Sequence, residues 1–382
     1  MLAFDTSPVS IFFATDSPTK LRMPARSQII ETVNKLKKLS DSRTISVRFA
    51  SVEESCIPSY LRSHLFVDAY LGINSSLCFR SFSEREFGSG TGLDIASASC
   101  HAVCEAAERL LPRLGGTKSA RPTVQSAFSL FTGSWTEFDF DPLDRSDSRN
   151  PFIFGGGQAV HPIAEEALRN AFCDLVERNF VATATGNENW FDITESLVEQ
   201  FDSCRETMNY WKSRGFDFHV SVSVTELGPF VVVASAKNRN PGGFPSTYRG
   251  SACDFCLEYA PLQAISELNR SGNFGPYQEL KDECDALSAR DKLHPKDYYY
   301  GFLSRLINGD WLTECSRKED QASISRLTNL YQPTPNKVLR AILGRYGDIF
   351  VVPYCSAGDL AIFGYKICVP GLSLAAVERV NL

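Results

Sequence analysis

The sequence is poor in the residues and motifs that mark the commonest catalytic sites. It contains five histidines and three methionines in 382 residues, and no histidine falls in an H-E-x-x-H motif. No G-x-S-x-G segment occurs, and the run GGTKS at 115–119 lacks the G-K-[ST] order of a P-loop. These absences argue against a zinc protease, an α/β-hydrolase and a nucleotide site of the P-loop type.

Long apolar runs and an excess of positive charge are missing as well. No stretch of about 18 uninterrupted apolar residues occurs, so no membrane span is expected. The first apolar run, MLAFDTSPVSIFF, follows no basic segment and is interrupted by Asp5 and Pro8. We therefore expect no signal peptide and a cytoplasmic location. The net charge of −6 gives no electrostatic reason to expect binding to nucleic acid.

Cysteine, in contrast, is abundant, with twelve residues. Without an export signal, disulfides are not expected, and most of these thiols are interpreted as small buried apolar groups. Two pairs have short spacings, Cys100 with Cys104 and Cys253 with Cys256. A structural zinc site would need both pairs to meet, so a zinc-stabilised binding module stays open as an alternative.

Strand-like and helix-like runs alternate along the chain, which predicts an α/β or α+β fold. Residues 1–80 are interpreted as an N-terminal part of the core, continuous with a catalytic core over 81–382. Helices are expected at 27–38, 162–180, 194–213, 259–270, 297–307 and 337–345. Strands are expected at 44–51, 76–82, 151–154, 217–224, 228–236, 349–353 and 362–369, and loops or a mobile insertion over 110–150.

An internal repeat is the most informative pattern. The segments 88–109, 157–178 and 250–270 align without gaps, and each begins with glycine. Alanine recurs ten and fourteen residues after each glycine, and an acid seventeen residues after it. The acids are Glu105, Asp174 and Glu267, and the first two segments add Glu108 and Glu177 three residues later.

These spacings place the alanines and acids on one stripe of a helix. Two alanines allow a close approach to a neighbouring element, and acids at i and i+3 point the same way. Each segment alone is typical of a solvated helix face, but three matching segments favour an acidic cluster. Carboxylates without paired histidines indicate Mg²⁺ rather than zinc. Arg109, Arg178 and Arg270 are candidate phosphate partners, and the glycine-rich stretches 88–92 and 155–157 are candidate phosphate-binding turns.

At these segments the sequence resembles the YcaO family. The first matches its glycine-rich stretch followed by an A-x-x-E-x-x-E-R helix, from Ala102 to Arg109. The second resembles a further helix of this kind, and the third resembles an A-x-x-E-x-x-Q helix with Arg270 in place of glutamine. The run YKICVPGL at 365–372 matches a late strand that leads into a P-G-[LM] turn.

The resemblance implies a YcaO-like fold that binds ATP between helices, with acids holding Mg²⁺. Carried over by position, the nucleotide ligands are Ser89, Glu105, Arg109, Asp174, Arg178, Glu267 and Arg270. The implied magnesium ligands are Glu105, Glu108, Glu177 and Glu267. Asp174 and Arg270 depart from the usual glutamate and glutamine, and the C-terminus lacks the proline-rich tail of many azoline-forming members.

The resemblance also implies the reaction, an ATP-dependent activation of backbone amides in a ribosomally made precursor peptide. Cyclodehydration of Cys, Ser or Thr to an azoline is the first interpretation. Thioamidation with a sulfur-delivering partner and a non-catalytic scaffold subunit remain open. Partner subunits for leader-peptide binding or dehydrogenation are expected, with a homodimer as a further option.

Overall fold

A computed structural model describes the chain over residues 7–16, 27–28, 30–32, 34–35, 45–51, 65–73, 85–92, 100–108, 123–140, 157–183, 190–224, 228–240, 247–274, 320–321, 323–355 and 362–369. Helices and largely antiparallel sheets alternate, so the fold is α+β. Across these ranges, no helix is both long enough and apolar enough to cross a membrane.

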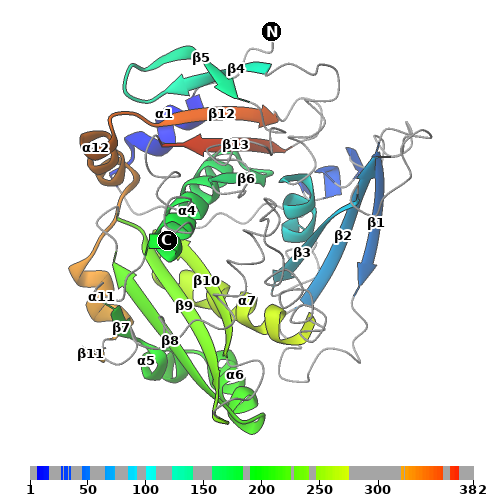
Figure 1. Ribbon diagram of the computed structural model, residues 1–382, viewed down its shortest axis with the longest axis vertical. Coiled ribbons are helices and arrows are strands. Elements are labelled where there is room, and N and C mark those ends of the chain that lie inside the picture. The colour runs from blue at the N-terminus through cyan, green and yellow to red at the C-terminus, as the bar shows by residue number, and fades with distance from the viewer. Residues whose placement is uncertain are drawn as a thin grey trace, which may run out of the picture.

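The strands form three sheets (Figure 1). The smallest is antiparallel, in the order β1 (Ile45–Ser51), β2 (Leu65–Ile73) and β3 (Arg85–Gly92). The second has the order β10-β9-β8-β7-β11, with β7 (Trp190–Asp192), β8 (Phe216–Val224), β9 (Phe230–Asn238), β10 (Thr247–Asp254) and β11 (Asp320–Gln321). Only the short pairing of β11 with β7 is parallel among the pairings described.

The third sheet joins distant parts of the chain in the order β5-β4-β12-β13-β6. Its strands are β4 (Thr123–Ser129), β5 (Ser134–Phe140), β6 (Gln158–His161), β12 (Phe350–Cys355) and β13 (Phe363–Cys368). All of its pairings are antiparallel. The C-terminal strands β12 and β13 therefore lie between strands from the first half of the chain.

Helix α4 (Ala164–Thr183) crosses the centre of the molecule between the two larger sheets (Figure 1). It packs on β6 and β13 on one side and on β10 and β9 on the other. Leu168 and Phe172 of α4 are fully buried in a core shared with α1 (Ser7–Ala14), α12 (Pro335–Tyr346), β12 and β13. The second core lies between the β8–β9 sheet and the helices α5 (Thr194–Gln200), α6 (Asp202–Ser213), α7 (Ala260–Phe274) and α11 (Ile324–Leu330).

Many of the expected elements are present. Within the expected helix 27–38, the structure describes residues 27–28, 30–32 and 34–35, and all of them are helical. Helices α4, α7 and α12 match their expected ranges closely. Strands β1, β8, β9, β12 and β13 also match expected runs. The expected strands 76–82 and 151–154 and the expected helix 297–307 lie outside the described residues.

Three expectations are wrong. The stretch 110–150, expected to form loops or a mobile insertion, contains the antiparallel β4–β5 hairpin. The helix expected over 194–213 is two helices, because Phe201 adopts an extended conformation (φ −128°, ψ 116°) between them. The glycine-rich stretch 88–92 is the end of strand β3 rather than a turn.

Each repeat segment is one strand–helix unit. The units are β3 with the helix of residues 100–108, β6 with α4, and β10 with α7. The repeated alanines have no exposed surface at Ala102, Ala167, Ala171, Ala260 and Ala264. The expected alanine stripe is therefore the face that each helix packs inward.

The first glycine of the second and third units has a steric cause. A Cβ at Gly250 would overlap the backbone of Ala264 and Leu268, because α7 passes directly over β10 there. A Cβ at Gly157 would lie 2.5 Å from the carbonyl oxygen of Ile367, and Gly157 has a positive φ of 75°. In both units the glycine thus lies against a helix residue eighteen positions later, Leu175 of α4 and Leu268 of α7.

Gly250→Ala is expected to destabilise the protein by at least about 2 kcal/mol, because the new methyl group must displace helix backbone. The control is Gly344→Ala in α12, an exposed site where a Cβ would have no other atom within 4 Å. That variant is expected to gain about 0.5–1 kcal/mol from helix propensity. Urea unfolding measures both, and equal effects of the two variants would contradict the packing argument.

Candidate active site

The predicted acids Glu177 and Glu267 meet at one serine. Ser251 of β10 donates its hydroxyl to Glu177 Oε1 of α4 at 2.6 Å. The backbone N–H of Ser251 donates to Glu267 Oε2 of α7 at 3.3 Å. The second and third repeat units therefore bring their acids together across β10.

The two carboxylates are close enough to repel each other. Burial raises the pKa of Glu177 to about 8, with Glu267 as the next cause and Asp174 adding a smaller effect. The hydrogen bond from Ser251 and the charge of Arg178 act in the opposite direction. A hard divalent cation bound to both carboxylates would offset this repulsion and stabilise their ionised forms.

Asp174 has a different environment from Glu177. Its Oδ2 accepts the backbone N–H groups of Gly157 at 2.6 Å and Gln158 at 3.4 Å. Its Oδ1 accepts Arg178 Nε at 2.7 Å. The charge of Asp174 is the leading cause of a raised pKa for the Arg178 guanidinium, which nevertheless keeps half of its side-chain surface exposed. Both oxygens of Asp174 are thus engaged by the protein.

The first repeat unit reaches the same region through its last turn. Gln158 Nε2 donates to the backbone carbonyl of Glu108 at 2.9 Å, which fixes the end of the helix of residues 100–108 against β6. The Glu108 charge contributes to raising the pKa of Arg178. Glu105 lies one turn earlier on that helix and is partly buried.

For the remaining predicted residues, the structure describes the backbone at most. Ser89 lies in β3, where its backbone pairs with Asp68, and Arg270 lies in α7. The side chains of Ser89 and Arg270, and the whole of Arg109, fall outside the described structure.

Three polar residues at the site were not predicted from the sequence: Ser251, Gln158 and Lys366. Lys366 lies on β13 opposite Gln158 and is 1% exposed. Burial lowers its pKa to about 8, while the charges of Asp174 and Glu108 favour the protonated form. A lysine within the apolar run IFGYKICV is the sequence signal that could have identified it.

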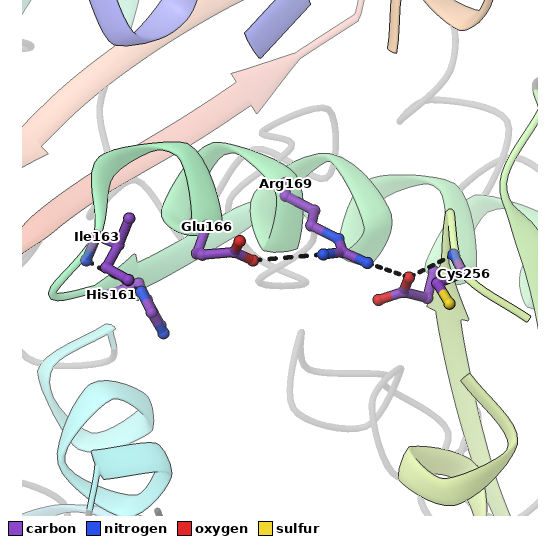
Figure 2. Close-up of polar contacts among 6 residues, drawn as sticks. His161, Ile163, Glu166, Arg169 and Cys256 are labelled. Carbon is purple, nitrogen blue, oxygen red and sulfur yellow. Dashed lines mark hydrogen bonds and ion pairs between the residues drawn. The ribbon is translucent and has the colours of Figure 1, made fainter. Parts of the chain in front are cut away.

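A buried ion triad anchors the helix that carries Asp174 and Glu177 (Figure 2). Arg169 of α4 pairs with Asp254 at the end of β10 and lies 3.5 Å from Glu166, with all three side chains buried. Asp254 also accepts the backbone N–H of Cys256 at 2.6 Å. Since α7 follows this turn, the triad ties α4 to the segment that leads to Glu267.

The turn before α4 is held by a histidine, also drawn in Figure 2. His161 Nδ1 accepts the backbone N–H of Ile163 at 3.0 Å. Burial lowers the pKa of His161 to about 4, with His101 as a further cause, so the ring is neutral at pH 7. A neutral imidazole can accept this hydrogen bond, which an imidazolium cannot.

The cysteines do not form a metal site in the described structure. Cys100 and Cys104 lie in the same helix with their sulfurs 4.0 Å apart, and both are buried. Over the described ranges, no group of three His, Cys, Asp or Glu side chains has the geometry to hold a metal ion. The site fits Mg²⁺ nonetheless, because this ion commonly uses one or two carboxylates and takes its other ligands from phosphates and water.

Comparisons with known proteins identify a family for this chain. A model of the family "YcaO cyclodehydratase, ATP- and Mg²⁺-binding" matches residues 126–373. A comparison with curated protein sequences gives no significant match.

Several solved structures share the fold at low sequence identity. YcaO from Methanopyrus kandleri, bound with AMPPCP and Mg²⁺, has a TM-score of 0.58 at 15% identity, with 94% of each chain covered. A heterocyclase in complex with substrate and cofactor also has a TM-score of 0.58 at 15% identity, over 93% of this chain and 54% of that one. This chain thus spans about half the length of that heterocyclase.

The E. coli microcin synthetase McbBCD complex with pro-MccB17 bound has a TM-score of 0.58 at 14% identity, over 84% of this chain and 87% of that one. At such identities the likeness shows the fold alone. The family model, however, covers well over half of the chain and includes the two repeat units that form the Glu177–Glu267 pair. The chain belongs to the YcaO family, whose model describes its members as cyclodehydratases that bind ATP and Mg²⁺.

Proposed function

We propose that this chain uses ATP and Mg²⁺ to activate backbone amides in a peptide substrate, and that it forms azolines from Cys, Ser or Thr. The observation that carries the proposal is the meeting of Glu177 and Glu267 at Ser251. Carboxylates from separate helices on one small surface favour a bound cation, and the family description supports ATP as the source of the phosphates that share it.

The proposed roles follow from position. Glu177 and Glu267 hold the magnesium ion, with Glu105 and Glu108 approaching from the first unit. Arg178 orients phosphate oxygens from the half-exposed edge of the site. Ser89, Arg109 and Arg270 stay candidate nucleotide contacts on the strength of the family resemblance.

The chemistry addresses an unreactive amide. The side-chain thiol or hydroxyl of the substrate adds to the carbonyl carbon of the preceding residue, and the former carbonyl oxygen must then leave. Bound ATP supplies the phosphoryl group that makes this oxygen a good leaving group, so that ADP and phosphate account for the water lost from the peptide. The protein contributes positioning and charge neutralisation.

Partners are part of the proposal. The similar microcin synthetase structure is a complex with a bound pro-peptide. We expect this chain likewise to act on a precursor peptide within a complex of several subunits. A cytoplasmic location and a homodimer within the complex remain predictions.

Nucleotide binding is the first test. A non-hydrolysable ATP analogue with Mg²⁺ is expected to raise the unfolding temperature of the wild-type protein, since a ligand that binds only the folded state stabilises it. Glu267→Gln and Glu105→Gln are expected to lower ATP turnover at least about 100-fold. The control is Glu258→Gln, an equivalent change at an exposed position just before α7. Normal turnover in both site variants would contradict the assignment.

Product mass decides the reaction. A Cys-, Ser- or Thr-rich peptide is expected to lose the mass of one water for each ring formed. A mass increase from replacement of oxygen by sulfur would indicate thioamidation, and an unchanged peptide without ATP turnover would indicate a scaffold subunit.

The acidic pair also predicts a pH dependence of stability. The folded-state pKa of Glu177 is about 8, against an ordinary value of 4.5. The folded protein therefore loses stability as the pH rises through this interval, because the unfolded chain releases the Glu177 proton while the folded chain, which buries this carboxyl beside Glu267, retains it. Glu177→Gln removes this cost, so its free energy of unfolding relative to wild type should increase between about pH 5 and about pH 9.

Urea unfolding without nucleotide or metal measures this difference. Glu165→Gln at the start of α4 is the control, and its difference from wild type should stay constant over the same range. A constant difference for Glu177→Gln as well would show that the fold does not raise the pKa of Glu177.

A further inference from the structure

The two acids of α4 that align with a family pair have different partners in this chain. Glu177 accepts the hydroxyl of Ser251 and lies beside Glu267. Asp174, one turn earlier, accepts two backbone N–H groups on one oxygen and Arg178 on the other. Asp174 is engaged by the protein on both oxygens, while Glu177 lies next to another carboxylate.

Side-chain length explains this difference. Aspartate is one methylene shorter than glutamate, so its carboxylate stays close to the helix and to the start of β6. There it reaches the N–H of Gly157, whose positive φ of 75° turns the chain toward α4. A cation on Oδ2, which already accepts two N–H groups, would have to displace one of them, and a cation on Oδ1 would have to share that oxygen with the Arg178 guanidinium.

Local charge points in the same direction. Asp174 pairs with Arg178 at 2.7 Å, and its charge favours the charged form of the buried Lys366. Glu177 is affected more strongly by the charge of Glu267 than by that of Arg178. A divalent ion therefore gains more from the Glu177–Glu267 pair than from a carboxylate that two cations already neutralise.

We propose that Asp174 is a positioning residue, which fixes Arg178 at the edge of the site and closes the Gly157 turn, and that it does not bind the metal. This inference rests on the proposed ATP- and magnesium-dependent function. Arginine loses rotamer freedom when it binds phosphate, and the contact between Asp174 and Nε removes much of that freedom in advance. The second repeat unit then supplies one metal ligand, Glu177, and one oriented guanidinium.

The test separates metal binding from nucleotide binding. Mn²⁺ replaces Mg²⁺ and is followed by electron paramagnetic resonance, and the affinity for a non-hydrolysable ATP analogue is measured by calorimetry at saturating Mg²⁺. Asp174→Asn is expected to change Mn²⁺ affinity less than about threefold and to weaken analogue binding about tenfold. Glu177→Gln is expected to weaken Mn²⁺ binding more than about tenfold.

Coupling to Arg178 is the second readout. If Asp174 acts through Arg178, the double variant Asp174→Asn with Arg178→Lys should bind the analogue no more weakly than the worse single variant. Additive losses would overturn the inference. Glu195→Gln, which removes one exposed negative charge on α5, is the matched control and should change neither affinity.

The remaining outcomes are also decisive. Loss of Mn²⁺ affinity in Asp174→Asn, with normal binding by wild type, would overturn this inference and leave the proposed function standing. Failure of wild type to bind the analogue would overturn both. Circular dichroism and urea unfolding of each variant establish that a folded protein is being compared.

Discussion

The candidate site depends on how closely two helices approach their strands. At Gly250 the backbone of α7 lies where a side chain would otherwise stand, and at Gly157 the neighbouring strand β13 leaves no room for a Cβ. Because these elements lie so close together, Ser251 of β10 can contact acids from both α4 and α7. The buried alanines at the two repeated positions of each helix serve the same requirement, because a larger side chain would move the carboxylates apart.

Close packing also sets the electrostatic character of the site. Two carboxylates that solvent would normally separate are held together by elements that the hydrophobic cores fix. The folded protein accepts this unfavourable interaction because the burial of α4 and α7 outweighs it. Arg178 and Lys366 neutralise the neighbouring acids, so the unfavourable charge is concentrated at the pair where a cation is proposed to bind. The buried triad of Glu166, Arg169 and Asp254 holds the same two segments at their other end.

Much of this arrangement can be predicted from the sequence, because the repeat carries both the packing residues and the acids. Periodicity identifies α4 and α7, and the alignment identifies Glu177 and Glu267 as acids of the repeat, twenty and seventeen residues after their glycines. The turn expected at Gly88 is wrong, since a glycine in a strand and a glycine in a turn look alike in sequence. Lys366 and Ser251 escape prediction because their importance depends on the pairing of distant strands. Sequence position alone predicts Asp174 as a nucleotide ligand, whereas its hydrogen bonds depend on where β6 lies.

The order of strands in the third sheet has a consequence for how the protein is made. The Gly157 turn, which receives the Asp174 carboxylate, is completed when its carbonyl oxygen accepts the N–H of Ile367 at 2.7 Å. That strand emerges from the ribosome about two hundred residues after the turn. Until then α4 has no contact with β13, one of the two strands of the third sheet on which it packs. A nascent chain therefore passes through a long interval in which the acids of α4 have been synthesised but are not yet assembled, and this interval exposes it to chaperones and proteases.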